Sequence, residues 1–210
     1  MRLTIDNLQG RGPVDYTAAL DGSVMPRVER KMNQPAELQC SLVASGSGFV
    51  TPAAGGRVIL ARTGGGFVFT GYLSAAPGFF YLGCGEQGPV YRYDLVAESD
   101  EVLLNQKALP NRAPFTARMA GAALRELAAD LMPGAFDCGA VEDVDTLASY
   151  PINPQKNFSY HAAEIALSAR ASYRAMNGAL LLAPVGAATY ALNESDTNFS
   201  PMGLTLACPK

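Results

Sequence analysis

The chain has 210 residues, of which 17% are charged and 49% hydrophobic, and its formal net charge is −3. This length is sufficient for one large or two small domains, each with its own hydrophobic core. The charged fraction lies below the roughly 25% of an average soluble domain. Such a surface is typical either of a protein that neighbours cover in part or of a mildly apolar monomer. The acidic balance argues against sequence-independent nucleic-acid binding, which depends on clustered lysine and arginine.

Cysteine spacing and hydropathy argue against a structural zinc site and against a membrane-spanning helix. The cysteines stand singly and form no C-x-x-C pair, which argues against a structural zinc site. We expect reduced thiols, mostly small core residues, at all four positions: Cys40, Cys84, Cys138 and Cys208. No apolar run approaches the ~18 residues of a membrane span. The only basic run, Arg27, Arg30 and Lys31, predicts a solvated strand face or a turn, so we expect no sequence-specific nucleic-acid binding.

The first hundred residues carry alternating patterns that predict β-strands. These strands fall near residues 3–5, 14–20, 38–42, 57–62 and 67–73. Asp21-Gly22, a strong hairpin dipeptide, follows the second strand, and Gly64 to Gly66 join the last two. Strands at such regular spacing, interrupted by glycine and proline, predict a small antiparallel β-barrel or sandwich over residues 1–104.

A further strand near residues 90–97 is rich in tyrosine. Its alternation places two sets of side chains on opposite faces. The first set is Tyr91, Tyr93, Leu95 and Ala97, and the second is Val90, Arg92, Asp94 and Val96. We expect the first set to face a core. The second set is partly polar, which predicts a wet or partner-facing side.

The pattern changes between Glu101 and Pro114, which predicts a domain boundary and an α+β domain over residues 105–210. A helix is expected from an N-cap at Thr116 to Met132, because its apolar residues recur on one stripe. Pro133-Gly134 ends this helix. The acidic, proline-containing segment 135–156 is predicted to be an irregular loop.

A second helix is predicted over residues 159–173, with Ser159 as its N-cap and Tyr173 on its apolar face. Asn177-Gly178 then predicts a turn between this helix and a strand at 179–183. We expect a return strand at 189–192. Residues 204–210 read like a strand cut short.

Several segments together resemble the baseplate-hub proteins at the tip of bacteriophage tails. They are Phe69-Thr70-Gly71-Tyr72, the strand 91–98 with the turn 99–104, the helix segment 160–167, and Asn177 to Pro184. The shared pattern is a barrel strand, a turn before a helix, and a helix followed by a hairpin. Hub proteins of this type usually continue into a second barrel, so we expect either a fragment or a departure from the family at the C-terminal end.

The resemblance implies a mainly β protein with a tail-tube-like N-terminal barrel and a two-helix α+β domain. It implies a non-enzymatic structural protein of the virion tail tip, assembled in the cytoplasm of the host bacterium. Its partners would be copies of itself, as a homotrimeric ring, the distal tail protein ring, the tape-measure protein and the tail fibre. Such a ring would continue the tail tube and connect the distal tail protein to the central fibre.

Three groups of residues were candidates for chemistry. His161 is the only histidine. No serine lies in a G-x-S-x-G motif with which it could form a catalytic triad, so we interpret it as a partly exposed helix histidine. The acidic cluster Asp137, Glu142, Asp143 and Asp145 lacks the ligand order of a calcium loop, and predicts a solvated loop. Asp94, Glu98, Asp100 and Glu101 could include a glycosidase pair, but sequence spacing does not give the carboxyl separation.

The glycines at 64–66 and 83–88 lack a phosphate-loop pattern and are predicted to be turns. We therefore expect no catalytic, cofactor or metal site. The alternative function is a carbohydrate-binding β-module, since nine tyrosines and nine phenylalanines could stack on sugars. The absence of tryptophan weakens this alternative. An enzyme of the lysozyme type ranks third.

Overall fold

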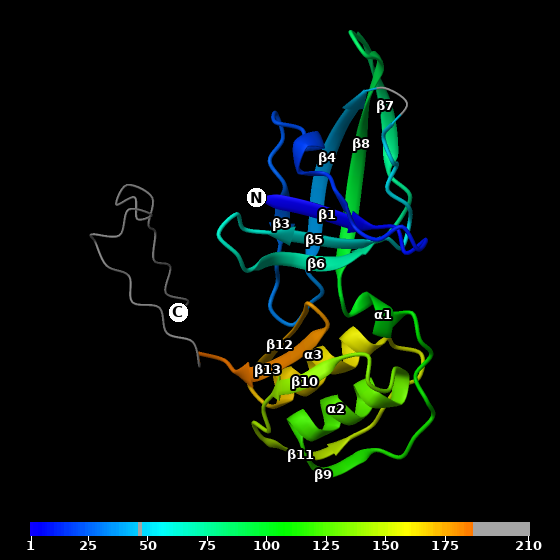
Figure 1. Cartoon of the computed structure of the whole chain (residues 1–210). Helices are drawn as coiled ribbons and strands as arrows, with labels where there is room; N and C mark the ends of the chain where they lie inside the picture. The colour runs from blue at the N-terminus through cyan, green and yellow to red at the C-terminus, as the bar shows by residue number, and fades with distance from the viewer. Residues whose placement is uncertain (46–47, 187–210) are drawn as a thin grey trace, which may run out of the picture.

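The computed structural model describes residues 1–45 and 48–186. Its buried apolar side chains form two clusters, one from Leu3 to Ala97 and the other from Leu104 to Leu182. Figure 1 shows a β-sheet above a smaller unit of strands and helices. We call residues 1–99 the N-terminal sheet and residues 102–186 the C-terminal unit. The division of the chain into independent domains stays a prediction.

The N-terminal sheet has eight strands, and every pairing in it is antiparallel. The strands are β1 (Arg2–Asp6), β2 (Val14–Asp15), β3 (Arg27–Glu29), β4 (Glu37–Ser45), β5 (Arg57–Ala61), β6 (Phe67–Leu73), β7 (Gly78–Gly85) and β8 (Gly88–Ser99). Their order is β2-β1-β5-β6-β8-β4-β3, and β7 pairs with β8. Within residues 1–45 and 48–99 no pairing joins β3 to β2. The prediction of a mainly β protein with antiparallel sheets is confirmed, whereas a closed barrel is not found.

Of three strands predicted near residues 3–5, 14–20 and 38–42, two are found and one is not. Strands are found near residues 3–5 and 38–42, with the alternate apolar side chains buried as expected. The predicted strand 14–20 is wrong, because β2 has two residues and a 3-10 turn, η1 (Thr17–Ala19), follows it. The Asp15 carboxylate accepts the Thr17 amide at 2.9 Å and turns the chain. Asp21-Gly22 therefore does not connect two paired strands.

β8 is the longest strand and holds the sheet together. One of its edges pairs with β4, and its other edge pairs with β7 over residues 88–94 and with β6 over 97–99. Gly71 on β6 lies so close to β8 that a Cβ there would collide with the Glu98 carbonyl. Leu95 and Ala97 are buried, Tyr93 packs against the same core as a partly buried side chain, and Val96 is exposed. The predicted register is confirmed for residues 93–97, whereas Tyr91 does not belong to the core.

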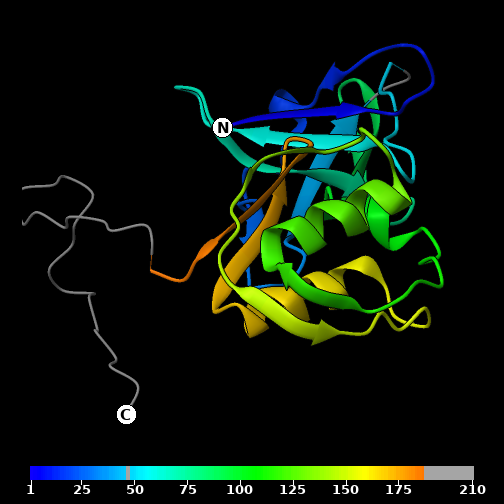
Figure 2. The same cartoon turned by 90° about the horizontal axis from the view of Figure 1, so that it is seen from below.

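The C-terminal unit combines three helices with two small sheets. Its elements are α1 (Val102–Asn105), β9 (Phe115–Met119), α2 (Ala120–Leu131), β10 (Asp137–Val141), β11 (Thr146–Tyr150), α3 (Phe158–Ser168), β12 (Ala171–Met176) and β13 (Ala179–Pro184). One sheet has the order β10-β13-β12, and β9 pairs with β11. Helix α3 packs on β12, and α2 packs on α3 and β10 (Figure 2).

The first predicted helix begins three residues later than expected, and the prediction of a loop over residues 135–156 is wrong. Thr116 lies on β9, and α2 starts at Ala120, whose amide donates to the Asp145 carbonyl at 2.8 Å. Segment 135–156 contains β10 and β11. These strands pair with β13 and β9, which lie far away in sequence, and a local pattern does not show such partners.

The second predicted helix is shorter than expected and has another cap. Its N-cap is Asn157, whose side chain accepts the Tyr160 amide at 3.0 Å, in place of Ser159. The helix ends at Ser168, and Arg170 has a φ of 51°, so Tyr173 lies on β12. The turn at Asn177-Gly178 and the following strand are confirmed. The predicted return strand 189–192 and segment 204–210 lie outside the described residues.

We expect Leu95→Ala to lower the free energy of unfolding by about 2 to 5 kcal/mol, because it leaves a cavity in the N-terminal core. Leu95 is 3% exposed, whereas its neighbour Val96 is 41% exposed. Val96→Ala, the matched control, should cost about 1 kcal/mol or less. Urea unfolding followed by circular dichroism measures both values, and the reverse order would contradict the register of β8.

Candidate functional site

The hairpin of β7 and β8 carries the largest exposed apolar group of the described chain. It extends from the top of the N-terminal sheet in Figure 1. Four consecutive side chains of β7 are more than half exposed: Phe79 (67%), Phe80 (51%), Tyr81 (60%) and Leu82 (53%). Within the described residues β7 pairs only with β8, so its other edge is open. We call this element the aromatic hairpin.

One face of the aromatic hairpin continues the core of the sheet. Phe79 lies opposite Tyr93, and Tyr81 lies opposite Tyr91 at a ring distance of 5.6 Å. Tyr93 in turn stacks on Phe49 with ring centroids 4.9 Å apart. A row of aromatic rings therefore runs from the buried core to the exposed end of the hairpin.

The opposite face combines an aromatic ring with charge. The Arg92 guanidinium lies 5.2 Å from the Phe80 ring centroid and forms an ion pair with Asp94 at 3.1 Å. Asp94 also accepts a hydrogen bond from the Ser41 hydroxyl at 2.7 Å. Both faces of β7 thus present aromatic side chains to solvent. A strand that is exposed and apolar on two faces, with an open edge, is typical of a surface that another chain covers.

His161 is buried, so its interpretation as a partly exposed histidine is wrong. It is 1% exposed, and its Nδ1 lies 2.8 Å from the Tyr150 hydroxyl oxygen. Its Nε2 lies 3.0 Å from the Asn153 carbonyl oxygen, which can only accept a hydrogen bond. Burial raises the pKa of the Tyr150 hydroxyl, which stays a donor to Nδ1. The ring thus fixes the segment before α3 to the helix.

The predicted acidic cluster is dispersed over β10 and the following loop. Asp143 forms an ion pair with Arg125 at 2.7 Å, while Asp137 and Asp145 accept the amides of Gly139 and Thr146. Among residues 1–45 and 48–186 no group of three potential metal ligands is found. Nor does any helix of this part of the chain have the length and apolar character to cross a membrane.

The cysteines of the described chain are free thiols. Cys40 is buried in the N-terminal core, and burial raises its thiol pKa to about 11. Cys138 is half-buried and Cys84 is exposed on β7. Cys208 lies outside the described residues.

The contact between the N-terminal sheet and the C-terminal unit is polar and centred on Asp100. We call it the junction. The buried Asp100 accepts the Thr70 hydroxyl at 2.7 Å and the Gly178 amide at 2.8 Å through the same oxygen. The Asn177 amide donates to the Thr70 hydroxyl oxygen at 2.6 Å. One carboxylate therefore connects β6 to the turn between β12 and β13.

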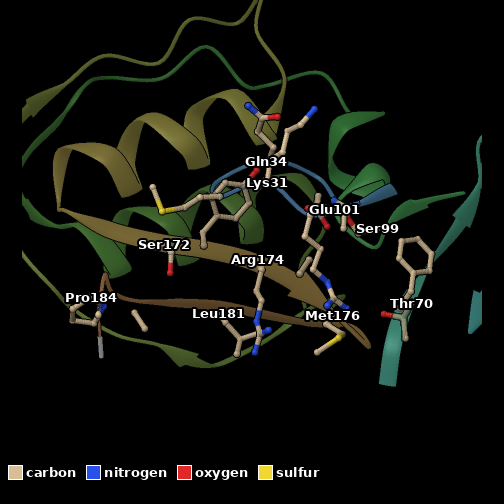
Figure 3. A pocket seen from close by; sticks show the side chains of 18 residues that line it. Lys31, Gln34, Thr70, Ser99, Glu101, Ser172, Arg174, Met176, Leu181 and Pro184 are labelled. Carbon is tan, nitrogen blue, oxygen red and sulfur yellow. The ribbon is translucent and has the colours of Figure 1, made fainter. Parts of the chain in front are cut away.

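Glu101 lies in the same junction and lines a cavity of about 450 Å³ (Figure 3). It is 1% exposed, and its Oε2 has no hydrogen-bond partner among the described residues. The pKa of this carboxyl is raised to about 7, mainly by burial and in smaller part by the neighbouring Asp100 and Glu98 charges. Of the four carboxylates considered for a glycosidase, Asp94 lies on the hairpin and only Asp100 and Glu101 are buried together here.

The sequence did not single out β7 as a functional element, and it named Glu101 only within the possible glycosidase pair. The run Gly78-Phe79-Phe80-Tyr81-Leu82 is continuously apolar, a pattern that a buried strand shares. Its flanking glycines were the available signal for an edge hairpin.

No family model matches the chain, and no curated protein matches it in sequence. Its fold is similar to that of the 43 kDa tail protein of prophage MuSo2 from Shewanella oneidensis, with a TM-score of 0.58 at 9% identity over 87% of this chain. A tail protein from Neisseria meningitidis MC58 gives 0.58 at 12% identity over 86%. Prophage tail protein gp18 from Listeria monocytogenes EGD-e gives 0.56 at 9% identity over 88%.

These comparisons place the fold among phage tail proteins. The chain covers 55%, 49% and 51% of the three structures, which is about half of their length.

Glu101→Gln should remove a pH dependence of stability. The folded state raises the pKa of Glu101 from 4.5 to about 7, so it holds the proton more tightly than the unfolded state does. The wild-type protein should therefore lose stability as the pH rises from about 4.5 to about 7, by an amount on the order of 3 kcal/mol. Urea unfolding at pH 5 and pH 8 measures this loss. If the free energy of unfolding changed with pH equally in Glu101→Gln and in the wild-type protein, the burial of this carboxyl would be contradicted. Glu86→Gln, on the exposed turn of the hairpin, is the control and should keep the pH dependence of the wild-type protein.

His161→Ala should lower the free energy of unfolding by about 2 to 4 kcal/mol, since it opens a cavity and leaves the Tyr150 hydroxyl without its acceptor. Leu167 lies on the same helix and is exposed, so Leu167→Ala should cost ~0.5 kcal/mol or less. Thermal melts of the two variants compare these effects. A His161→Ala variant as stable as the wild-type protein would support the interpretation of His161 as a partly exposed histidine.

Proposed function

We propose that the chain is a structural subunit of a phage-type tail tip, a baseplate-hub protein that forms a ring with copies of itself. The aromatic hairpin is the observation that carries this proposal. The fold shared with phage tail proteins supports a structural role in a tail, and catalysis has no part in it.

The composition of β7 distinguishes it from an ordinary edge strand. Natural proteins protect open edges with charged residues, and β3, at the end of the sheet, follows that rule with Arg27 and Glu29. From Gly78 to Gly85, β7 has no charged residue. Burying an aromatic or leucine side chain contributes ~1.5 to 3 kcal/mol, so covering the four exposed residues would stabilise an assembly substantially.

A ring of identical subunits provides the covering surface. The open edge of β7 can add backbone hydrogen bonds to a neighbouring strand, and its two apolar faces can pack against that neighbour. A closed barrel, which one chain does not form in its described residues, would then arise from strands of adjacent subunits. We propose a trimer that continues the tail tube, in line with the resemblance to hub proteins.

The remaining partners belong to the same proposal. A hub ring would lie beneath the distal tail protein ring, contain the tape-measure protein or DNA in its lumen, and hold the tail fibre below. Its place would be the virion tail tip, and assembly would occur in the cytoplasm of the host bacterium.

A carbohydrate-binding module is the alternative, because exposed Phe79 and Tyr81 could stack on sugars. Their geometry favours this function less. Tyr81 is inclined by 56° to Tyr91, and Phe79 by 37° to Tyr93, so the rings do not form one flat platform. A glycan-array signal from a strictly monomeric protein would support this alternative.

Replacing Phe79 and Phe80 together by serine should abolish ring formation while leaving the fold intact, since both side chains are mainly exposed. The matched control replaces Met25 and Leu167, two exposed apolar residues outside the hairpin, by serine. Sedimentation velocity at high protein concentration and negative-stain images measure the oligomer. A wild-type protein that stays monomeric and is missing from purified tail particles would refute the proposal.

A further inference from the structure

The junction cavity borders an open stretch of strand edge on β12. The two-residue turn at Asn177-Gly178 sets the hairpin register, so that Ser172, Arg174 and Met176 bond to β13. The backbone groups of the alternate residues, Ala171, Tyr173 and Ala175, therefore face away from β13.

Side chains of the N-terminal sheet and its loops satisfy only the two ends of this edge. Asn33 donates to the Ala171 carbonyl at 3.2 Å and accepts the Tyr173 amide at 2.8 Å. Thr70 accepts the Asn177 amide at 2.6 Å. Between these ends, the Tyr173 carbonyl and the Ala175 amide have no hydrogen-bond partner among the described residues.

The residues that carry these two unpaired groups line the cavity. Tyr173 and Ala175 line it, yet their side chains belong to the core of the C-terminal unit. Their backbone is therefore the part available to the cavity. The Asn33 amide already imitates one residue of a neighbouring strand, because it bonds both the Ala171 carbonyl and the Tyr173 amide. The residue two positions further along such a strand would bond the Tyr173 carbonyl and the Ala175 amide.

The charges of the cavity indicate which side chains would accompany such a strand. Glu101 supplies a buried carboxylate oxygen without a partner. Lys31 pairs with Glu29 at 2.9 Å, and Arg30 donates to the Val68 carbonyl. Arg174 is exposed and has no ion pair among the described residues. Figure 3 shows Glu101 beside Ser99, and it shows Arg174 on β12.

We propose that the junction cavity binds a short extended segment of a partner polypeptide, which pairs with the Tyr173 carbonyl and the Ala175 amide and places a basic side chain against Glu101. An acidic residue beside the basic one pairs with Arg174. Main-chain pairing makes the ligand a polypeptide, and the unpaired Oε2 of Glu101 selects a lysine or arginine. This site is separate from the aromatic hairpin and does not depend on ring formation.

Titration calorimetry and amide NMR shifts with the capped peptide acetyl-Ala-Arg-Ala-Asp-amide test the proposal on the full chain. We expect saturable shifts of the Ala175 and Gly178 amides. The bound cation requires ionised Glu101, whose pKa is about 7, so affinity should rise roughly tenfold from pH 6 to pH 8. Glu101→Gln should lower the affinity at pH 8 roughly tenfold and remove the pH dependence.

Three controls make the result decisive. Glu86→Gln, the same change on the exposed turn of the hairpin, should bind the peptide as the wild-type protein does. Arg174→Gln should weaken binding without removing its pH dependence. The peptide with glutamine in place of arginine should bind poorly. The proposal falls if no saturable shift occurs at millimolar peptide, if Glu101→Gln binds like wild type, or if the glutamine peptide binds equally well.

Discussion

The buried carboxylate of Asp100 is the interaction on which the arrangement of the two parts of the chain depends. It lies directly after β8 and receives hydrogen bonds from Thr70 of β6 and from Gly178 of the β12–β13 turn. A buried carboxylate without such donors would be strongly unfavourable. The hydrogen bonds therefore hold the N-terminal sheet and the C-terminal unit in one relative position, and that position creates the cavity beside Glu101.

Features set by neighbours in sequence could be predicted, and features set by distant partners could not. The alternation at Leu95 and Ala97 and the turn at Asn177-Gly178 follow from local pattern and backbone preference. The local pattern does not reveal β10, because its partner β13 follows about forty residues later and pairs with it in parallel. His161 was misjudged for the same reason, since Tyr150 and Asn153 come from a segment that looked like a loop.

The candidate sites also depend on contacts between segments that are distant in sequence, which a local pattern does not reveal. The partly polar face at Arg92 and Asp94 predicted a partner-facing side of β8, but the unbroken apolar run of β7 resembles a buried strand and conceals its exposure. In the sequence, Glu101 is one of four carboxylates that could include a glycosidase pair, and nothing in the local pattern predicts its burial. Its burial is a property of the tertiary structure, in which it lines the junction cavity together with residues of the loop after β3 and of β12.

The length of β8 has a mechanical consequence. Its twelve residues span roughly 40 Å of extended backbone, from the exposed turn of the aromatic hairpin to the residue before Asp100. β4 lies antiparallel beside nine of these residues, so a pull along β8 loads many hydrogen bonds in shear at once. A force applied at the aromatic hairpin is thus transmitted along β8 to Asp100, the carboxylate that joins the two parts of the chain.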